Sequence, residues 1–300
     1  MKVAYLVVSH VNPRQVLRLA RALGEGDGSE VVVRHDQRRS RLDDAAVEEA
    51  GARLMRDGLD VEWGDWSYLR MLLGALQHIA AELDPDWVLV LSGQDYPLRP
   101  IGEIEDRLAS SPHDAYVGAC WELDTERFPR GREAEFFLRY AYLHLRAPGL
   151  SAFPARVRRL AYYRDRPRRL GIRRLRLPFR DDLHCWVSSD WPALSRRAME
   201  AVLRTAREER RLMRHYRRTV APSESFFATA LMNDPGLRVS HDDRRYVRFQ
   251  PGAPSPDVLT IADLDELKAS GAHFARKFDA ALDDRVLDGL DELRRSGSPR

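Results

Sequence analysis

WVLVLSGQDYPL, residues 87–98, begins as a run of five apolar residues and breaks into polar residues at Ser92. An apolar run without alternation, flanked by turn formers, predicts a strand that is buried on both faces. The polar residues then lie at the carboxyl end of a central parallel strand, where open α/β sheets place their ligand crevice. Gly93 permits close backbone approach, Asp95 offers a carboxylate, and Pro97 stiffens the exit. We therefore expect an α/β fold with a binding site after this strand.

Alternating strands and helices surround this strand. Residues 3–9 and 30–36 are predicted strands, and the helix between them carries Pro13 in its first turn, so we expect a right-handed parallel crossover. Other predicted helices span residues 43–55, 68–83, 101–108, 195–216, 223–232 (with Ser223 as N-cap) and 261–270. Other predicted strands span residues 59–62, 113–120, 183–187 and 245–249. No linker divides the chain, so we expect one domain over residues 1–296 and a frayed tail at 297–300.

Composition limits the class of protein. The apolar fraction of 44% is that of a globular chain, and a net charge of +3 is too small to imply a nucleic-acid partner by itself. No signal peptide or membrane-spanning run is present, so we expect a cytoplasmic protein or one attached peripherally at the inner membrane face. Residues 156–180 hold eleven arginines and one acid. This composition has three interpretations: a solvated surface, a site for an acidic acceptor or nucleic acid, or an attachment to anionic lipid. We rank a solvated surface or membrane attachment above binding of nucleic acid.

Several catalytic signatures are missing. The sequence has no Walker A loop, no GxGxxG after its first strand, no nucleophile elbow and no HExxH. Two Asp-x-Asp triplets occur, but residues 84–86 precede their strand and residues 263–265 fall in a predicted helix. Only Asp95 follows the central strand. A metal clamp on a diphosphate is therefore not expected, and cations would have to hold any diphosphate that binds.

Seven short motifs occur in an order that resembles a known family. They are AYLVVSHVNP (4–13), RHD (34–36), WGDWS (63–67), LSGQDYPL (91–98), SDWPALSR (189–196), PSESFF (222–227) and FARKFD (274–279). Together they resemble the core-2/I-branching β-1,6-N-acetylglucosaminyltransferase family, which also contains peptide O-xylosyltransferases. The resemblance is to a bacterial-type member, and we expect no membrane anchor. Each motif is weak alone, but their order over residues 3 to 279 is specific.

This resemblance implies a GT-A fold, a UDP-sugar donor carrying GlcNAc or xylose, and inversion at the anomeric carbon. It also implies a nucleotide-sugar half at residues 1–120, an acceptor half at 121–296, and no metal or other cofactor. The family's Pro-Asp-Glu motif, which supplies its catalytic base, corresponds to residues 222–224. The resemblance therefore makes Glu224 the catalytic base, although Ser223 replaces the aspartate in the middle of the motif. Arg245, or its neighbour Arg244, and Lys277 correspond to the family's diphosphate ligands.

The chemistry of an inverting transfer agrees with these assignments. One carboxylate must take the proton of the acceptor hydroxyl, and positive charge must stabilise the departing UDP. Taken by spacing alone, Glu224 would be a first-turn helix acid, and Arg245 and Lys277 would be surface charges.

Other site residues are open to two interpretations. Asp36 resembles a family acid that lies beside the nucleotide, and Asp95 either positions a sugar or caps a turn. Trp191 is a candidate for stacking on a sugar, whereas buried packing is expected for Trp63 and Trp66. The partners are then a UDP-sugar and a glycan or other hydroxyl acceptor. The alternative is a non-catalytic protein that binds nucleic acid or an anionic surface through the basic stretch from Arg156 to Arg180.

Overall fold

The computed structural model describes residues 1–131, 133–146, 161–164, 169–180, 182–251, 253 and 255–297. The helices are α1 (Pro13–Leu23), α2 (Asp44–Glu49), α3 (Trp66–Glu82), α4 (Ile101–Ala109), α5 (Glu133–Tyr140), α6 (Arg196–Glu208), α7 (Arg210–Tyr216), α8 (Ser223–Met232), α9 (Leu264–Ala269), α10 (Arg285–Gly297) and a 3₁₀ turn (Ile261–Asp263). The strands are β1 (Val3–Ser9), β2 (Ser29–His35), β3 (Ala52–Leu54), β4 (Trp87–Ser92), β5 (Tyr96–Pro97), β6 (Ala115–Tyr116), β7 (Trp121–Glu122), β8 (Tyr142–Arg146), β9 (Ala161–Arg164), β10 (Arg169–Arg173), β11 (Trp186–Val187), β12 (Ala193–Ser195), β13 (Val239–Ser240), β14 (Arg245–Val247) and β15 (Phe274–Arg276).

A seven-stranded mixed sheet forms the centre of the fold, with strand order β13-β6-β12-β4-β1-β2-β3. β1 pairs in parallel with both β2 and β4, whereas β12 runs antiparallel between β4 and β6. The α/β, GT-A-like architecture expected from the sequence is therefore present. Strands from both sides of residue 120 build this one sheet, so the two predicted halves share it.

The central strand β4 is buried along its whole length, as its unbroken apolar run predicts. Val88 and Val90 point into a core that includes residues of α3, α5, α6 and α8. Leu89 and Leu91 point into a second core that includes residues of α1, α4 and α10. Because both faces of the strand meet apolar layers, alternation with polar residues is absent.

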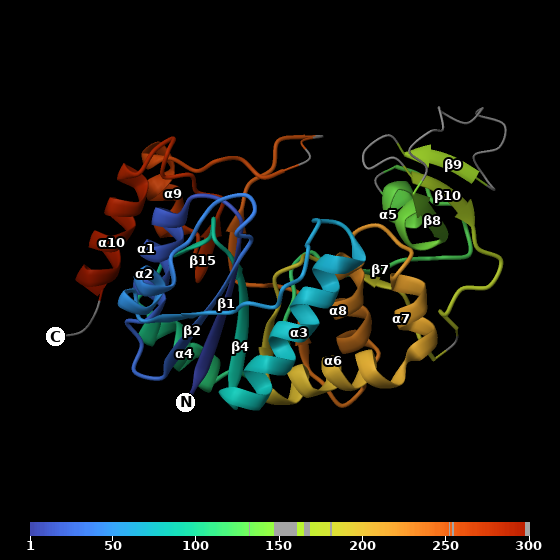
Figure 1. The fold of residues 1–300 in the computed structure, drawn as a ribbon, viewed down its shortest axis with the longest axis horizontal. Coiled ribbons are helices and arrows are strands. Elements are labelled where there is room, and N and C mark those ends of the chain that lie inside the picture. The colour runs from blue at the N-terminus through green and yellow to red at the C-terminus, as the bar shows by residue number, and fades with distance from the viewer. Residues whose placement is uncertain are drawn as a thin grey trace.

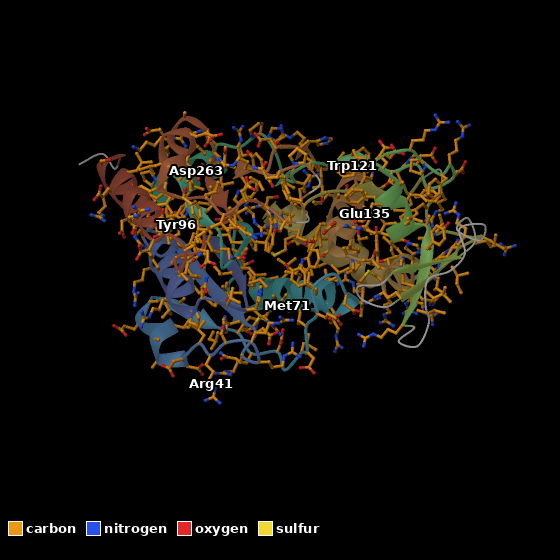
Figure 2. All side chains as sticks on the ribbon, turned by 90° about the horizontal axis from the view of Figure 1, so that it is seen from above. Arg41, Met71, Tyr96, Trp121, Glu135 and Asp263 are labelled. Carbon is orange, nitrogen blue, oxygen red and sulfur yellow. The ribbon has the colours of Figure 1, made fainter. Side chains whose placement is uncertain are left out.

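Smaller elements extend this core in two directions. A three-stranded sheet, β14-β15-β5, joins the C-terminal part of the chain to the segment after β4. Figure 1 shows α5, β8, β9 and β10 at the opposite end of the molecule from α1, α2 and α10. In Figure 2, Tyr96 and Asp263 lie toward the α10 end, Trp121 and Glu135 lie toward the other end, and Met71 lies between them.

Two predictions about residues 43–62 are wrong. The helix predicted for residues 43–55 ends at Glu49, because Gly51 has φ 73° and turns the chain into β3. Residues 59–62 do not form a strand. The Leu59 carbonyl accepts a hydrogen bond from Arg34 of β2, and the Val61 carbonyl accepts one from Arg38 in the segment after β2. These bonds replace pairing with another strand.

The long basic helix predicted for residues 195–216 is two helices. Glu209, with ψ 64°, interrupts it, and the change of direction lets Leu212 and Tyr216 of α7 become fully buried. Ser223 is the first residue of α8 rather than its N-cap, and its side chain is buried. The strands predicted for residues 113–120, 183–187 and 245–249 are present but shorter, and a 3₁₀ turn forms the beginning of the helix predicted for residues 261–270.

Candidate active site

The floor of the candidate site is the turn after β4. A Cβ atom on Gly93 would lie 2.6 Å from the Cβ of Ser9, so only glycine lets β1 and this turn approach so closely. Ser9 Oγ lies 2.8 Å from His35 Nδ1 at the end of β2. The polar ends of β1, β2 and β4 thus meet at one edge of the sheet, as the sequence predicts.

Asp95 is completely buried and faces two arginines. Its carboxylate lies 3.3 Å from Arg245 Nε and 3.4 Å from Arg276 Nε, and it accepts a hydrogen bond from the Ser92 amide at 3.2 Å. It therefore caps the turn and also balances buried positive charge. With no exposed surface, it contacts these arginines rather than any solute in the crevice.

Arg245 is also enclosed. Its side chain is 4% exposed, and its guanidinium donates to the carbonyl groups of Trp191 at 3.0 Å and Val90 at 3.2 Å. Arg244, the alternative of the sequence prediction, is 46% exposed and pairs with Asp242 at 3.4 Å. The structure thus brings Arg245 close to the turn after β4. There its hydrogen bonds hold the surrounding backbone in place.

The last residue of β15 and the first residue after it bring two cations to this edge. Phe278 donates its amide to the carbonyl of Gln94 at 2.9 Å, which fixes the segment against the turn after β4. Lys277 is half-buried, and its Nζ donates to Ser255 Oγ at 3.2 Å. Within the described ranges no carboxylate pairs with Lys277. Its neighbour Arg276 packs 4.5 Å over the ring of Trp191, so one face of that indole is already covered.

Glu224 lies in the first turn of α8, where its carboxylate accepts a hydrogen bond from Arg139 of α5. The backbone around it is tied to neighbouring segments: Glu224 O accepts from Ser188 N at 2.7 Å, and Ala221 N donates to Gly64 O at 2.8 Å. The position of this acid is therefore set by contacts with three parts of the chain that are distant in sequence.

A second acid, Asp190, shares this environment. Burial, then the negative charge of Asp190, raises the pKa of the Glu224 carboxyl to about 7, against the opposing charge of Arg139. Burial also raises the pKa of Asp190, against the charges of Arg276 and Arg139 among other groups. Asp190 Oδ1 is buried without a hydrogen-bond partner among the residues described. With a pKa of about 7, the Glu224 carboxyl takes up and releases a proton near neutral pH, the range in which a general base operates.

The remaining predicted residues occupy different surroundings. Asp36 is paired with Arg38 at 2.9 Å, and hydrogen bonds from Arg38 lower the pKa of Asp36 to about 2. Trp63, expected to be buried, is 64% exposed, which corrects that prediction. The Ala221 amide donates to the Gly64 carbonyl, which fixes this loop beside Glu224, and a hydrogen bond from the Trp63 side chain is among the groups that lower the pKa of Asp190. The indole therefore lies at the surface over this site and not in the core. Trp66 is partly buried, with Arg217 5.4 Å from its ring centre.

Three residues of this arrangement were not predicted: Asp190, Arg276 and Arg139. Asp190 and Arg276 lie inside the quoted motifs SDWPALSR and FARKFD, so a signal was present. Arg139 lies in the irregular middle region, and nothing in its neighbourhood distinguishes it from the other arginines. Only its contact with Glu224 identifies it.

The two Asp-x-Asp triplets play structural roles. Asp84 pairs with Arg196, Asp263 forms a capping box with Thr260, and Asp265 is 98% exposed. Over the residues that the structure describes, no three His, Cys, Asp or Glu side chains are grouped to hold a metal ion. In the same part of the chain, no helix combines the length and apolar character needed to cross a bilayer.

The arginine-rich stretch is partly outside the described residues, since residues 156–160 and 165–168 are not described. Three of its described arginines are used inside the protein. Arg169 pairs with Asp65, Arg173 packs 4.5 Å over Phe137, and Arg174 contacts His215. These three side chains stabilise the fold rather than forming an open basic surface.

Comparison with known proteins gives relatives of one chemical class. No family model matches the chain. It is 26% identical over 263 residues to a xylosyltransferase of Drosophila melanogaster, covering 80% of this chain and 27% of the relative. It is 27% identical over 236 residues to a beta-glucuronosyltransferase of Arabidopsis thaliana, covering 74% of this chain and 53% of the relative. The chain is similar in sequence to glycosyltransferases.

Among solved structures, mouse xyloside xylosyltransferase 1 aligns with a TM-score of 0.42 and 10% identity, covering 92% of this chain and 97% of that one. The chain spans 27% of the length of the Drosophila relative and 53% of the length of the Arabidopsis relative. Because those relatives are enzymes, the comparisons favour a glycosyltransferase over a non-catalytic binding protein.

Proposed function

We propose that the chain is an inverting glycosyltransferase that moves a sugar from a UDP-sugar to a hydroxyl group of a glycan or other acceptor. The observation that carries this proposal is the Glu224 carboxyl, whose pKa is about 7, in a fold that places Arg276 and Lys277 at the end of β4. The sequence similarity to xylosyl- and glucuronosyltransferases supports the transfer of a sugar, which is the coarser part of this proposal. Membership of the core-2/I-branching family is part of the proposal and rests on the seven ordered motifs.

In the proposed reaction, the acceptor oxygen attacks the anomeric carbon while its proton passes to Glu224. The bond between that carbon and the diphosphate oxygen breaks, and UDP leaves with the electron pair. Lys277 and Arg276 stabilise the negative charge that grows on the diphosphate. We infer that Arg245, which is almost fully buried, acts through its charge and its contact with Asp95 rather than by touching the diphosphate.

The protein's own cations are proposed to replace a metal ion. The turn after β4 carries one acid, Asp95, and it is engaged with two arginines. Asp36, at the end of β2, is proposed to face the nucleoside, and Trp191 to border the sugar through the edge that Arg276 leaves free. The donor sugar is proposed to be xylose or GlcNAc from the resemblance, with glucuronic acid added by the plant relative. We propose a cytoplasmic site of action.

Release of UDP tests this function. The chain is incubated with UDP-xylose, UDP-GlcNAc or UDP-glucuronic acid, with and without simple glycoside acceptors, and free UDP is measured. One donor should be consumed, and Glu224→Gln should abolish its consumption while UDP still binds. Asp190→Asn is made in parallel because the two acids share one environment: if only Asp190→Asn abolishes turnover, the base is Asp190. Absence of UDP binding in calorimetry would refute the proposed function.

A further inference from the structure

We propose that Arg139 is a positioning residue that fixes the orientation of the Glu224 carboxylate and keeps it ionised. This inference rests on the proposed role of Glu224. It concerns α5, a helix in the irregular middle of the sequence for which no function was expected.

The guanidinium of Arg139 is held on three sides. It donates through Nη1 to Glu224 Oε2 and through Nη2 to Glu135 Oε1 at 2.6 Å. Its Cζ atom lies 4.8 Å from the ring centre of Phe136, and that ring packs edge-on against Trp121 with 4.9 Å between the ring centres. The Arg139 side chain is 11% exposed. An arginine restrained in this way presents its donors in one direction, which orients the carboxylate that accepts from them.

Helix α5 makes a second contact with the turn that carries Glu224. Tyr140, next to Arg139, is fully buried and donates its hydroxyl hydrogen to the Ala221 carbonyl at 2.8 Å. Ala221 has φ 48°, so this turn adopts a left-handed conformation just before α8. Two adjacent residues of α5 thus hold the backbone and the carboxylate of one short segment, which fixes the helix relative to the acid.

The charges around Glu224 explain why a cation is needed there. Asp190 and Glu135 are acids that act on the Glu224 carboxyl, and Arg139 is the cation that opposes them. Two phenol groups, Tyr68 of α3 and Tyr140 of α5, also face this acid. Without Arg139, burial and two neighbouring acids would favour the protonated form of Glu224, which cannot accept a proton from the acceptor hydroxyl.

The test uses Arg139→Gln, Arg139→Lys and, as a matched control, Arg146→Gln. Arg146 is 75% exposed and pairs with Glu62 at 3.3 Å on the same part of the molecule. Carboxyl resonances of protein labelled with ¹³C-glutamate are followed against pH, and Glu224→Gln assigns the Glu224 signal. The pH dependence of kcat is measured with the UDP-sugar that the wild type consumes.

In Arg139→Gln, the Glu224 signal and the rising limb of kcat should both move upward by about 1–3 pH units. Arg139→Lys should recover most of this change, and Arg146→Gln should leave both midpoints unchanged. The KM for the UDP-sugar should stay within about twofold in all three variants, because the diphosphate lies elsewhere. If Glu224 titrates at its wild-type pH in folded Arg139→Gln, the inference is overturned. If no UDP-sugar is consumed, the proposed function fails, and the resonance titration still decides the role of Arg139.

Discussion

Replacing Asp95 with asparagine should destabilise the protein strongly. Asp95 is fully buried, and its carboxylate is the charge that faces the guanidinium groups of Arg245 and Arg276, whose side chains are 4% and 15% exposed. Asparagine has nearly the same shape and can still accept the Ser92 amide, so the backbone turn keeps its hydrogen bond. What is lost is the negative charge. Arg276 then has no paired carboxylate within the described residues, and Arg245 keeps only Asp243, 3.6 Å away.

Removing one partner of a buried ion pair costs about 3–5 kcal/mol, because the other charge is left without compensation. A domain with a free energy of unfolding of about 5–15 kcal/mol would lose a large part of its stability. The same variant should weaken UDP binding, since Arg276 precedes Lys277 and its packing on Trp191 depends on where its guanidinium is held.

Equilibrium unfolding in urea, followed by the fluorescence of the six tryptophans, measures this cost. Asp84→Asn is the control: Asp84 is 74% exposed and paired with Arg196, so its loss should cost at most about 1 kcal/mol. Adding Arg276→Met to Asp95→Asn should recover part of the stability, because Asp95 is the carboxylate that pairs with Arg276 within the described residues, whereas Arg245 also lies 3.6 Å from Asp243. A free energy of unfolding for Asp95→Asn within about 1 kcal/mol of the wild type, at unchanged m-value, would refute the reasoning.

Three further predictions concern the chemistry. The pKa of Glu224 is raised from 4.5 to about 7 in the folded state, so its contribution to stability is full below pH 4.5 and is lost as the pH rises through 7. Glu224→Gln should therefore be more stable than the wild type above pH 8, by about 3 kcal/mol at most, with little difference at pH 4; equal melting temperatures at both pH values would contradict the raised pKa. Lys277→Ala should weaken UDP binding at least about tenfold in calorimetry, while Lys268→Ala, an exposed lysine of α9, should not; equal dissociation constants would exclude a clamp at Lys277. UDP release should continue in EDTA, and activity that disappears and returns with Mg²⁺ would show that a metal takes part.

The sequence by itself determined the framework of the site. The apolar run of β4 predicted a strand buried on both faces, and Gly93 predicted a close backbone approach, which the structure shows to be that of β1. These features are local: a strand between two apolar layers cannot tolerate alternation, and a tight turn needs a residue without Cβ. The ordered motifs also predict glycosyl transfer, and the comparisons support that class of enzyme.

Only the tertiary structure decided which polar groups meet. The burial of Arg245 against Asp95, the pairing of Arg139 with Glu224 and the exposure of Trp63 involve segments that are far apart in the sequence. A side chain's charge and size are local properties, whereas its burial and partners depend on how β12, β14 and β15 return to the central strands. The pKa of Glu224 depends on that return, because Asp190 and Arg139 reach it from different elements of the fold.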